Sequence, residues 1–427
     1  MARALYSFVL RLALPLALLR LWWRGRREPA YREHVGERFG RYAERAGAGV
    51  LWLHAVSVGE ARAAAPLVRA LQGAFPESDL LLTCTTAAGR TTLAQLYGER
   101  VQCAFLPYDL PGAMARFVAH FRPRIGIMME TEVWPNLLAA CRERGTPVVL
   151  ANARLSRKSA RGYARFAWLA RPAFASLAAV CAQDRGAARR LARLGARNVV
   201  VSGNLKFDVE PDPAKVDEGR AFRTALRGRK VLLLASTREG EEALLLDALG
   251  EDDGSLLLVV PRHPRRFDEV AALLAARGLA FARRSLGEAP HAAKRVYLGD
   301  TMGEMAFYYS TCDVALIGGS FQRLGGQNLI EACALGAPVI VGPHMYNFAE
   351  ATRQALAAGA ALQANDAGEA MRQARALLAD AGRRAQMGAA GVRLCAAHRG
   401  ATERHVAVVR GLLEAAAPAR LRARAPG

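Results

Sequence analysis

Residues 49–56 read GVLWLHAV and residues 79–86 read DLLLTCTT, and the stretch between them is rich in Ala, Leu and Arg. Each quoted segment is a short apolar run bounded by polar residues, which is typical of a buried β-strand. The intervening stretch predicts an amphipathic helix as far as residue 74. Strands that alternate with helices in this way predict a parallel β-sheet covered on both faces.

The same alternation continues along the chain and starts a second time. In the first half, further buried strands are predicted at residues 101–109, 124–130, 146–153, 178–184 and 199–204. Residues 208–219, DVEPDPAKVDEG, combine Pro, Asp and charge without periodicity and predict a linker. After it, apolar runs predict a second parallel sheet from residues 230–237, 255–264, 295–300, 314–319 and 337–343. The tail, residues 366–418, is expected to be mostly helical.

A chain of 427 residues usually forms two domains of about 200 residues each. We assign residues 28–208 to an N-terminal α/β domain, 209–219 to the linker and 220–427 to a C-terminal α/β domain. The predicted fold is therefore two doubly wound, Rossmann-like domains. Ligands of such sheets bind beyond the carboxyl ends of the strands, so we expect the two domains to face a central cleft.

The composition indicates an anionic partner. There are 59 basic and 38 acidic side chains, a net charge of +21. Nucleic acid, anionic lipid and phosphorylated small molecules would all be attracted by such a charge. Only five of the basic residues are Lys, which indicates a coding bias toward Arg. Part of the net charge of +21 therefore reflects this bias and not a binding function. Seven Cys without a Cys-x-x-Cys pair fit a reducing cytosol.

The amino terminus predicts a membrane anchor over residues 1–27. Residues 4–23, ALYSFVLRLALPLALLRLWW, match one bilayer thickness but are interrupted by two Arg and one Pro. The terminal Trp pair is followed by three Arg, the arrangement of an aromatic belt beside anionic headgroups on the cytoplasmic side. Spanning and interfacial placements both stay open. A cleaved signal peptide is disfavoured because a small-residue cleavage site is missing.

Carboxylates follow two predicted strands of the first half. In HAVSVGE, Glu60 stands in the first turn of an expected helix, where it could also simply complement the helix dipole. In METEVWPN, Glu130 and Glu132 close a very apolar strand. Paired carboxylates suggest acid–base chemistry or a clamp on sugar hydroxyls, and a solvated strand end is the alternative.

Further polar residues follow the next strands. ANARLS presents Asn152 and Arg154, and GNLKFD presents Asn204, Lys206 and Asp208. Lys206 is notable because lysine is scarce in this chain, and a compact ammonium differs from a guanidinium in what it can bind.

Basic and polar side chains also follow the strands of the second half. Arg262, His263 and Arg265 crowd one strand end, which suits a phosphate, although His263 could be a turn residue between prolines. GDTMGE, residues 299–304, offers backbone amides at an expected helix start. Two Gly pairs precede Asn328 and Glu331, which share a helical face where a Glu can hold both ribose hydroxyls. The set predicts a nucleotide site.

Several other chemistries are excluded by their missing motifs. The sequence has no P-loop, no G-x-G-x-x-G opening a helix, no G-x-S-x-G elbow and no H-E-x-x-H. The eight His show no metal-ligand spacing. Kinase, dinucleotide oxidoreductase, serine hydrolase and zinc hydrolase activities are therefore not expected.

Eight motifs in a fixed order resemble one known family, the Kdo (3-deoxy-D-manno-octulosonic acid) transferases of lipopolysaccharide biosynthesis. They are HAVSVGE, LPYDLP, METEVWPN, ANARLS, GNLKFD, VPRHPRRF, GDTMGE and the GGSF, GGQN and GPHMYNF series between residues 318 and 348. The resemblance covers nearly the whole chain. It implies the GT-B architecture and an enzyme on the cytoplasmic side of the inner membrane. Such an enzyme moves Kdo from CMP-Kdo to lipid IVA, the lipid A precursor, and inverts the anomeric centre.

The resemblance also implies roles for particular residues. Glu60 would be the general base that deprotonates the acceptor hydroxyl, while Glu130 and Lys206 would assist around the transition state. CMP would be held by Arg262, His263, Met302, Gly303, Glu304, Asn328, Leu329, Ile330 and Glu331. Gln327 and Arg238 depart from the family pattern, because His is common at both places. The implied partners are CMP-Kdo, lipid IVA and an anionic membrane surface, with no nucleic acid, metal or cofactor.

Two other functions compete with Kdo transfer as interpretations of the sequence. The first is another membrane-associated glycosyltransferase or an epimerase on the same fold; HAVSVGE together with METEVWPN favours Kdo transfer over it. The second is a non-enzymatic basic protein that binds membranes or nucleic acid, which predicts no nucleotide site. With 7% aromatic residues and no stacking motif, recognition of single strands is not expected. Because the base and the phosphate site lie in different halves, transfer is expected to need domain closure.

Overall fold

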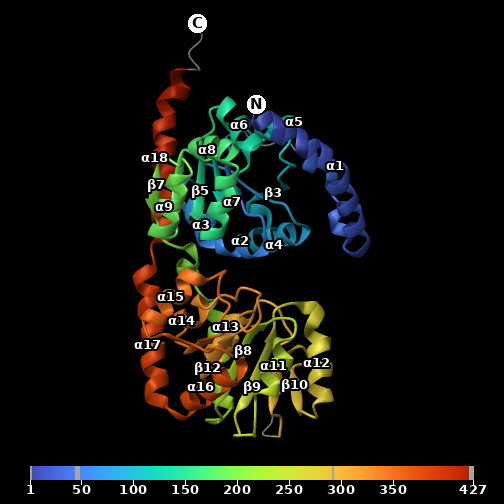
Figure 1. Ribbon diagram of the computed structural model, residues 1–427, viewed down its shortest axis with the longest axis vertical. Helices are drawn as coiled ribbons and strands as arrows, with labels where there is room; N and C mark the ends of the chain where they lie inside the picture. The colour runs from blue at the N-terminus through green and yellow to red at the C-terminus, as the bar shows by residue number, and fades with distance from the viewer. Residues whose placement is uncertain (1, 44–48, 291–292, 423–427) are drawn as a thin grey trace. The chain divides into compact units, whose positions relative to one another are not determined.

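The computed structural model describes residues 2–43, 49–290 and 293–422 (Figure 1). The chain divides into two compact units: unit 1 takes Met1–Asp208 with Arg399–Gly427, and unit 2 takes Val209–His398. Each unit is built around one parallel seven-stranded sheet. The predicted fold, two α/β units with alternating strands and helices, is confirmed.

The sheet of unit 1 has the order β3-β2-β1-β4-β5-β6-β7. Its strands are β1 Leu51–His54, β2 Leu80–Cys84, β3 Gln102–Phe105, β4 Ile125–Met129, β5 Val148–Ala153, β6 Ala179–Ala182 and β7 Val199–Val201. Its connecting helices are α2 Val58–Ala63, α3 Ala65–Ala74, α4 Ala87–Tyr97, α5 Pro111–Phe121, α6 Pro135–Glu143, α7 Arg157–Arg165, α8 Ala167–Ala175 and α9 Arg185–Arg193. Strand β1 shows why the sheet is buried on both faces. Trp52 packs into the layer of α5, α6, α8 and α9, while its neighbours Leu51 and Leu53 pack into the layer of α2, α3 and α4.

A glycine makes room for the largest side chain of this core. Trp52 is fully buried and lies beside Gly126 of the adjacent strand β4. A Cβ at Gly126 would stand 2.8 Å from the indole ring. Only a residue without a side chain therefore fits here against the ring.

The sheet of unit 2 has the order β10-β11-β9-β8-β12-β13-β14. Its strands are β8 Val231–Thr237, β9 Leu256–Pro261, β10 Phe281–Arg283, β11 Val296–Leu298, β12 Val314–Ile317, β13 Val339–Val341 and β14 Ala361–Gln363. Its α-helices are α10 Pro213–Ala225, α11 Glu241–Asp247, α12 Phe267–Ala276, α13 Met305–Thr311, α14 Ile330–Ala334, α15 Ala349–Ala357, α16 Ala367–Ala379 and α17 Ala381–His398. Helices α11, α12 and α16 share one core layer, and α10 packs against α13.

Each sheet has a switch point between two neighbouring strands that are distant in sequence. In unit 1 the neighbours β1 and β4 are separated in sequence by β2 and β3, and in unit 2 the neighbours β8 and β12 are separated by β9, β10 and β11. At such a switch point the loops leaving the two strands diverge and leave room for a ligand outside the carboxyl ends.

The predicted domain boundary at the carboxyl end was wrong. Residues 220–427 were expected to form one domain, but the last helix, α18 Ala401–Arg422, belongs to unit 1. Its buried residues Val406, Val409 and Leu413 recur every three or four positions and pack into the core layer that also contains α3. The core of unit 1 therefore buries the apolar stripe of α18.

The predicted linker at residues 209–219 is also partly wrong, because α10 begins at Pro213. The Asp212 side chain accepts a hydrogen bond from the Ala214 N–H at 3.0 Å. An Asp cap followed by Pro in the first turn is a helix start, and this signal accounts for the Pro and Asp that suggested a linker.

Helix α1, Ala2–Arg27, continues through Pro15. Within Ala2–Arg26, a stretch of 18 residues has a mean hydropathy of 1.7 and is 6% buried, and by length and composition this helix could cross a membrane. The beginning of α1 is tied to the unit 1 core, because the Ser7 hydroxyl donates to Asn136 Oδ1 of α6 at 3.1 Å. Helix α1 is therefore a candidate membrane anchor.

Candidate active site

Glu60 is held at the switch point of unit 1 by the turn between β1 and α2. Ser57 caps α2 and accepts the Glu60 N–H at 3.3 Å. The Glu60 carboxylate in turn accepts the Val56 N–H at 2.9 Å and the Ser57 hydroxyl at 3.3 Å. This exchange resembles a capping box, in which Ser and Glu three residues apart satisfy free amides. The helix-capping alternative thus holds for Glu60, and the same contacts fix its carboxylate beside β4.

Glu130 follows β4 directly and has two cationic neighbours. Arg154 Nε lies 2.6 Å from Glu130 Oε2, and Lys206 Nζ lies 3.7 Å from Glu130 Oε1. Glu130 is 7% exposed and has a φ of 58°, and Asn152 at the end of β5 has a φ of 50°. Left-handed backbone costs a non-glycine residue about 1–3 kcal/mol, and such strain concentrates at functional sites.

The electrostatics of the cluster set the protonation of Glu60. Burial, together with the charges of Glu130 and Glu132, raises the pKa of Glu60 to about 7, although the Val56 N–H opposes the change. Burial lowers the pKa of Lys206, and the charges of Glu130 and Glu60 oppose that change. A carboxyl group that titrates near neutral pH can take and return a proton, which is what a general base requires.

The structure therefore brings Glu60, Glu130 and Lys206 together, along with Arg154. Glu132 is engaged locally instead, because its Oε2 accepts the Trp134 indole N–H at 2.6 Å. Glu130 and Glu132 thus have different hydrogen-bond partners, and the left-handed φ of Glu130 ends the strand there.

In unit 2, the Arg262–His263 pair follows β9 and is joined to the end of β8. The Arg262 N–H donates to the Thr237 carbonyl oxygen at 2.9 Å. Burial, followed by the positive charges of Arg238 and Arg262, lowers the pKa of His263. This part of unit 2 therefore has a positive potential that suits an anion.

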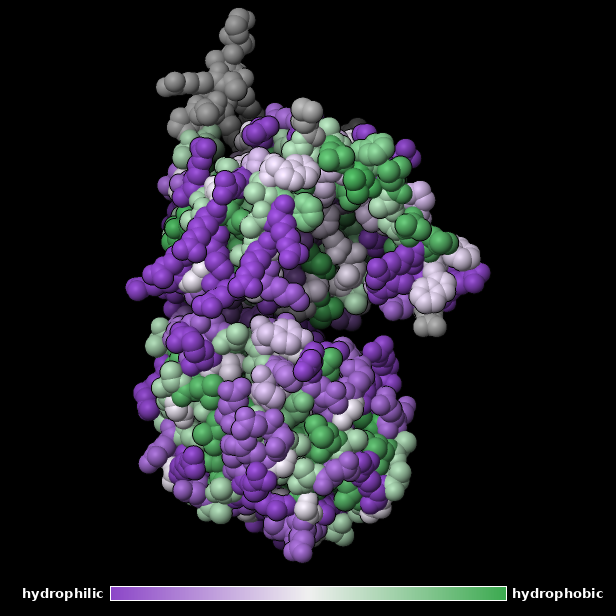
Figure 2. All heavy atoms as spheres, viewed as in Figure 1, coloured by the Kyte–Doolittle hydropathy of each residue, from purple (hydrophilic) through white to green (hydrophobic). Residues whose placement is uncertain are grey.

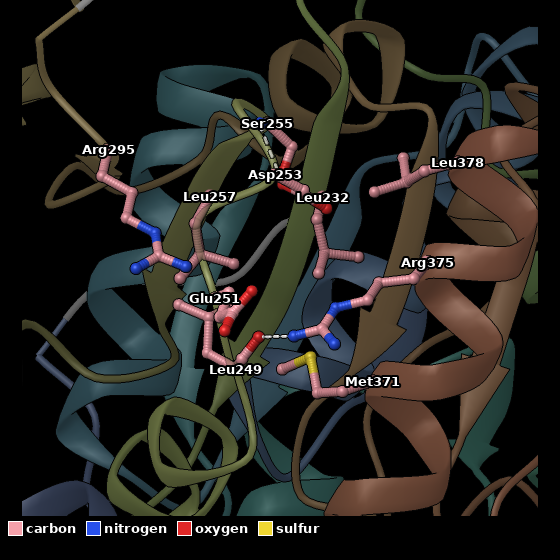
Figure 3. Close-up of a pocket in the computed structure, with 10 residues that line it drawn as sticks. All are labelled: Leu232, Leu249, Glu251, Asp253, Ser255, Leu257, Arg295, Met371, Arg375 and Leu378. Atoms are coloured by element: carbon pink, nitrogen blue, oxygen red, sulfur yellow. Dashed lines mark hydrogen bonds between the residues drawn. The ribbon is translucent and has the colours of Figure 1, made fainter.

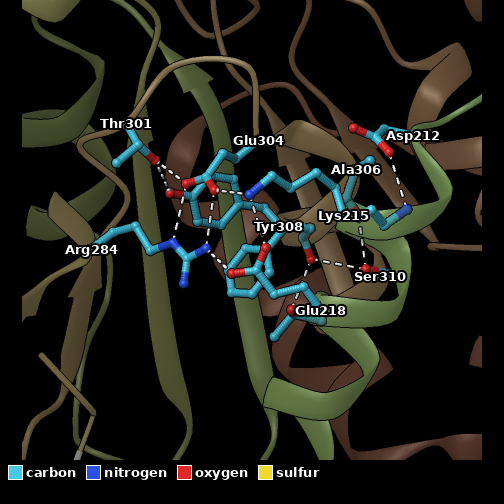
Figure 4. Close-up of polar contacts among 12 residues, drawn as sticks. Asp212, Lys215, Glu218, Arg284, Thr301, Glu304, Ala306, Tyr308 and Ser310 are labelled. Atoms are coloured by element: carbon cyan, nitrogen blue, oxygen red, sulfur yellow. Dashed lines mark hydrogen bonds and ion pairs between the residues drawn. The ribbon is translucent and has the colours of Figure 1, made fainter. Parts of the chain in front are cut away.

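The loop at residues 302–304 presents backbone to the surface and turns its carboxylate inward. Met302 is 48% exposed, and Gly303 has a φ of +84° with open space around it. The Glu304 carboxylate accepts hydrogen bonds from Lys215 at 2.7 Å and from Arg284 at 3.0 and 3.1 Å, and it also bonds Thr301 (Figure 4). Burial raises the pKa of Glu304, but these partners outweigh it and lower the pKa to about 2.

Asn328 orients Glu331 at the start of α14. Its Oδ1 accepts the Ile330 N–H at 3.1 Å and its Nδ2 donates to Glu331 Oε1 at 2.9 Å. Leu329 and Ile330 are 1% and 3% exposed, so both residues belong to the core.

Sequence reasoning missed Glu241, which joins the two strand ends at the switch point of unit 2. Its buried carboxylate accepts the N–H groups of Gly319 and Phe321 from the loop after β12, and that of Arg238 from the loop after β8. The available signal was a Glu in the first helical turn after Gly240. A Cβ at Gly319 would lie 3.1 Å from Gln327 Nε2 and 3.5 Å from Arg238 Cγ. The two departures from the family pattern thus flank one glycine.

A small cavity near the amino-terminal ends of the central strands of the unit 2 sheet is not a candidate binding site. It is lined by Leu232 and Leu257 near the beginnings of β8 and β9 and by charged residues that include Asp253 and Arg375 (Figure 3). Its volume of about 10 Å³ has room for at most one water molecule. Among the residues with described positions, no three His, Cys, Asp or Glu side chains gather as a metal site.

Two units, each with a parallel seven-stranded sheet and polar residues at its switch point, have the GT-B architecture. A glycosyltransferase from Rickettsia africae has the same fold, with a TM-score of 0.59 at 12% identity over 86% of this chain and 99% of that one. So does the UDP-GlcNAc 2-epimerase of Neisseria meningitidis, with a TM-score of 0.58 at 16% identity over 85% and 100% of the two chains. These similarities concern the fold alone.

The family profile of 3-deoxy-D-manno-octulosonic acid transferase matches residues 33–209. The enzyme of that name from Bordetella pertussis is 49% identical over 95% of this chain and 98% of its own. The one from Haemophilus influenzae is 35% identical over 97% and 99%. The chain belongs to the Kdo transferase family and is a glycosyltransferase, as its motifs predicted.

Proposed function

We propose that the protein transfers Kdo from CMP-Kdo to lipid IVA, with inversion at the anomeric carbon, in lipopolysaccharide biosynthesis. The observation that carries this proposal is the geometry of the Glu60 carboxylate: the Val56 N–H and the Ser57 hydroxyl hold it at the switch point of unit 1, where burial and the charge of the ion-paired Glu130 raise its pKa to about 7. Family membership supports Kdo as the transferred group.

In the proposed step, Glu60 accepts the proton of an acceptor hydroxyl while the hydroxyl oxygen bonds to the anomeric carbon of Kdo. The bond between that carbon and the CMP phosphate oxygen breaks, and CMP leaves with the electron pair. A single displacement of this kind inverts the anomeric centre. The hydrogen bond from the Val56 N–H orients the base, and buried surroundings raise its affinity for the proton.

Glu130 and Lys206 are proposed to assist this step from beside the base. The Glu130 charge keeps Glu60 a stronger base, because it raises the pKa of Glu60. Lys206 and Arg154 hold Glu130 in place and supply positive charge where negative charge develops. The proposal also requires donor bound to unit 2 to reach Glu60 of unit 1 during turnover, through closure of the two units.

We propose that unit 2 binds the CMP part of the donor through Arg262, His263, Met302, Gly303, Glu304, Asn328, Leu329, Ile330 and Glu331. Their contributions differ. Arg262 supplies charge for the phosphate, and Glu331, oriented by Asn328, is placed to accept ribose hydroxyls. Leu329 and Ile330 are core residues that fix Asn328 and Glu331 in place, and Glu304 shapes its loop through Lys215 and Arg284.

An anionic membrane surface is the proposed location, on the cytoplasmic side of the inner membrane. Residues 154–197 contain eleven basic side chains and one acidic one, so 11 − 1 gives +10 of the total +21. They include α7 and α9, and hydrophilic side chains project over this part of unit 1 (Figure 2). Phe166 and Trp168 are 59% and 47% exposed between these helices, as interfacial aromatic residues are. Together with α1, this surface would meet lipid headgroups and the phosphates of lipid IVA.

The test is reconstitution with defined substrates. Purified full-length protein is incubated with CMP-Kdo, a CMP-Kdo regenerating synthase and lipid IVA in anionic vesicles. The mass of the lipid product is then measured by mass spectrometry. We expect lipid IVA to gain one or more Kdo residues with release of CMP. Transfer from another sugar nucleotide, with none from CMP-Kdo, would reject the proposal.

A further inference from the structure

The beginning of α18 clamps the segment that carries Lys206. The Asp208 carboxylate accepts the N–H groups of Gly400 at 2.9 Å and of Thr402 at 2.5 Å. From the same helix, Arg404 Nε donates to the Ser202 carbonyl oxygen at 2.7 Å. Both ends of residues 202–208 are therefore fixed by a helix that arrives from almost 200 residues later in the chain.

His405 of this helix reaches into the core beneath the site. It is 1% exposed, its Nε2 accepts the Asn152 N–H at 2.9 Å, and its Nδ1 lies 2.7 Å from the Ala401 carbonyl oxygen. Because a backbone N–H can only donate, Nε2 carries no proton, and Nδ1 must be the donor to Ala401. The ring is therefore neutral and has a defined tautomer. Burial, which lowers the pKa of His405 to about 4, keeps it so.

Asn152 needs this partner because it leaves the β-sheet ladder. Its φ of 50° falls at a register shift in the β5–β6 pairing between Leu150 and Ala153. Its N–H is thereby turned away from β6 and toward His405. Its Oδ1 accepts the Leu205 N–H at 3.1 Å, and its carbonyl oxygen accepts the Gln183 amide at 2.9 Å.

The backbone of Asn152 thus connects His405 to both cations beside Glu130. Arg154 lies two residues further along the strand end, and Lys206 is the residue after Leu205. Both of these side chains contact the Glu130 carboxylate. A change in the conformation of Asn152 would therefore move both charges relative to Glu130 and Glu60.

We propose that His405 is a positioning residue of the transfer reaction, acting through Asn152 on Arg154 and Lys206. The inference rests on the proposed role of the Glu130 cluster. It assigns the carboxyl-terminal helix a part in the chemistry of unit 1 in addition to its part in the core. His405 itself is not expected to touch a substrate.

The test compares His405→Phe, which keeps a ring but removes the acceptor, with His405→Gln, which places an amide oxygen near the former Nε2. For H405F we expect kcat to fall at least tenfold, with KM for donor and acceptor changed less than twofold. We also expect the rising limb of the pH–rate profile to move to higher pH, because a displaced Lys206 no longer favours ionised Glu60. H405Q should recover kcat to within about threefold of the parent protein.

Two further variants separate positioning from stability. Val409→Ala truncates the buried face of α18 one turn beyond His405, leaves the bond to Asn152 in place, and should lower the melting temperature while leaving kcat per folded molecule and the pH profile unchanged. If H405F does not fold, Asp208→Asn weakens the same clamp and should lower kcat with the same upward shift of the limb. Parent-like kcat and pH profile in H405F, or in D208N if H405F is unfolded, would overturn the inference. If Lys206→Met also retains full kcat, the proposed role of the cluster fails together with the inference.

Discussion

Glu60 and Glu130 come close enough at the ends of β1 and β4 for the charge of Glu130 to raise the pKa of Glu60. The two residues are 70 positions apart, and they meet because β1 and β4 are neighbours at the switch point of the sheet. Glu130 is ion-paired with Arg154 and Lys206. Two carboxylates in one site thus have different environments, the arrangement by which enzymes separate a base from a charge-stabilising group.

The first prediction concerns the pH dependence of transfer. A base must be deprotonated, and the pKa of Glu60 is raised to about 7. We therefore expect kcat to rise with pH through a limb centred near 7, when measured from pH 5.5 to 9 at saturating substrates. Glu132→Gln removes the smaller of the two neighbouring negative charges, so its profile should keep the rising limb and move it to lower pH by less than Glu130→Gln does. A profile that is flat between pH 5.5 and 8 would contradict the assignment of the base.

Removing the neighbouring charges should move the limb in opposite directions. Glu130→Gln leaves Arg154 and Lys206 without their carboxylate, so the pKa of Glu60 should fall and the limb should move to lower pH. Lys206→Met removes a positive charge, so the limb should move to higher pH. Both variants should lower kcat at least tenfold, and initial rates across pH for the two proteins check the signs. Shifts of the same sign would show that the two side chains do not act through the Glu60 charge.

Unit 2 contains a buried ion pair whose loss should be costly. Arg266 and Glu242 are paired at 2.7 Å and are 4% and 0% exposed at their side chains. Removing one partner leaves a buried charge alone, so Arg266→Ala should lower the free energy of unfolding by about 3–5 kcal/mol. Denaturant titration with Arg265→Ala as the control, whose side chain is 76% exposed, measures the difference. Equal midpoints for the two variants would refute this account of the pair.

Acid should destabilise the fold through two buried histidines. Burial lowers the pKa of His54 to about 3 and that of His405 to about 4. Between these values and about 6.5, the unfolded chain binds protons that the folded chain does not, so each His removes about 1.4 kcal/mol per pH unit as the pH falls. Glu60 acts in the opposite direction between its ordinary pKa and 7. Urea midpoints at pH 7 and pH 5 should therefore fall less for H405Q than for the parent protein, and an equal fall would contradict the assignment to His405.

The fold and the first-unit site were largely predictable from local pattern. Apolar runs that alternate with amphipathic stretches require buried parallel strands, and polar residues after parallel strands collect at one edge. The Ser57–Glu60 spacing likewise indicates a helix cap at which a carboxylate is fixed. These features depend on residues close together in sequence.

The rest depended on contacts between distant residues. The apolar stripe of α18 specifies a buried face but not which of two sheets covers it. The Glu304 carboxylate is bound by Lys215 and Arg284, and its own motif contains neither residue. The left-handed turn of Asn152 and its bond to His405 join positions 253 residues apart. The hydrophobic periodicity of a sequence does not predict a contact between residues this far apart.

The most direct measurement of the central claim is single-turnover transfer by Glu60→Gln at pH 8, with CMP-Kdo binding measured on the same preparation. The account predicts donor binding within about threefold of the parent protein, because the proposed nucleotide residues lie in unit 2, and a transfer rate at least a thousandfold lower. Transfer by Glu60→Gln within tenfold of the parent rate would show that Glu60 is not the base.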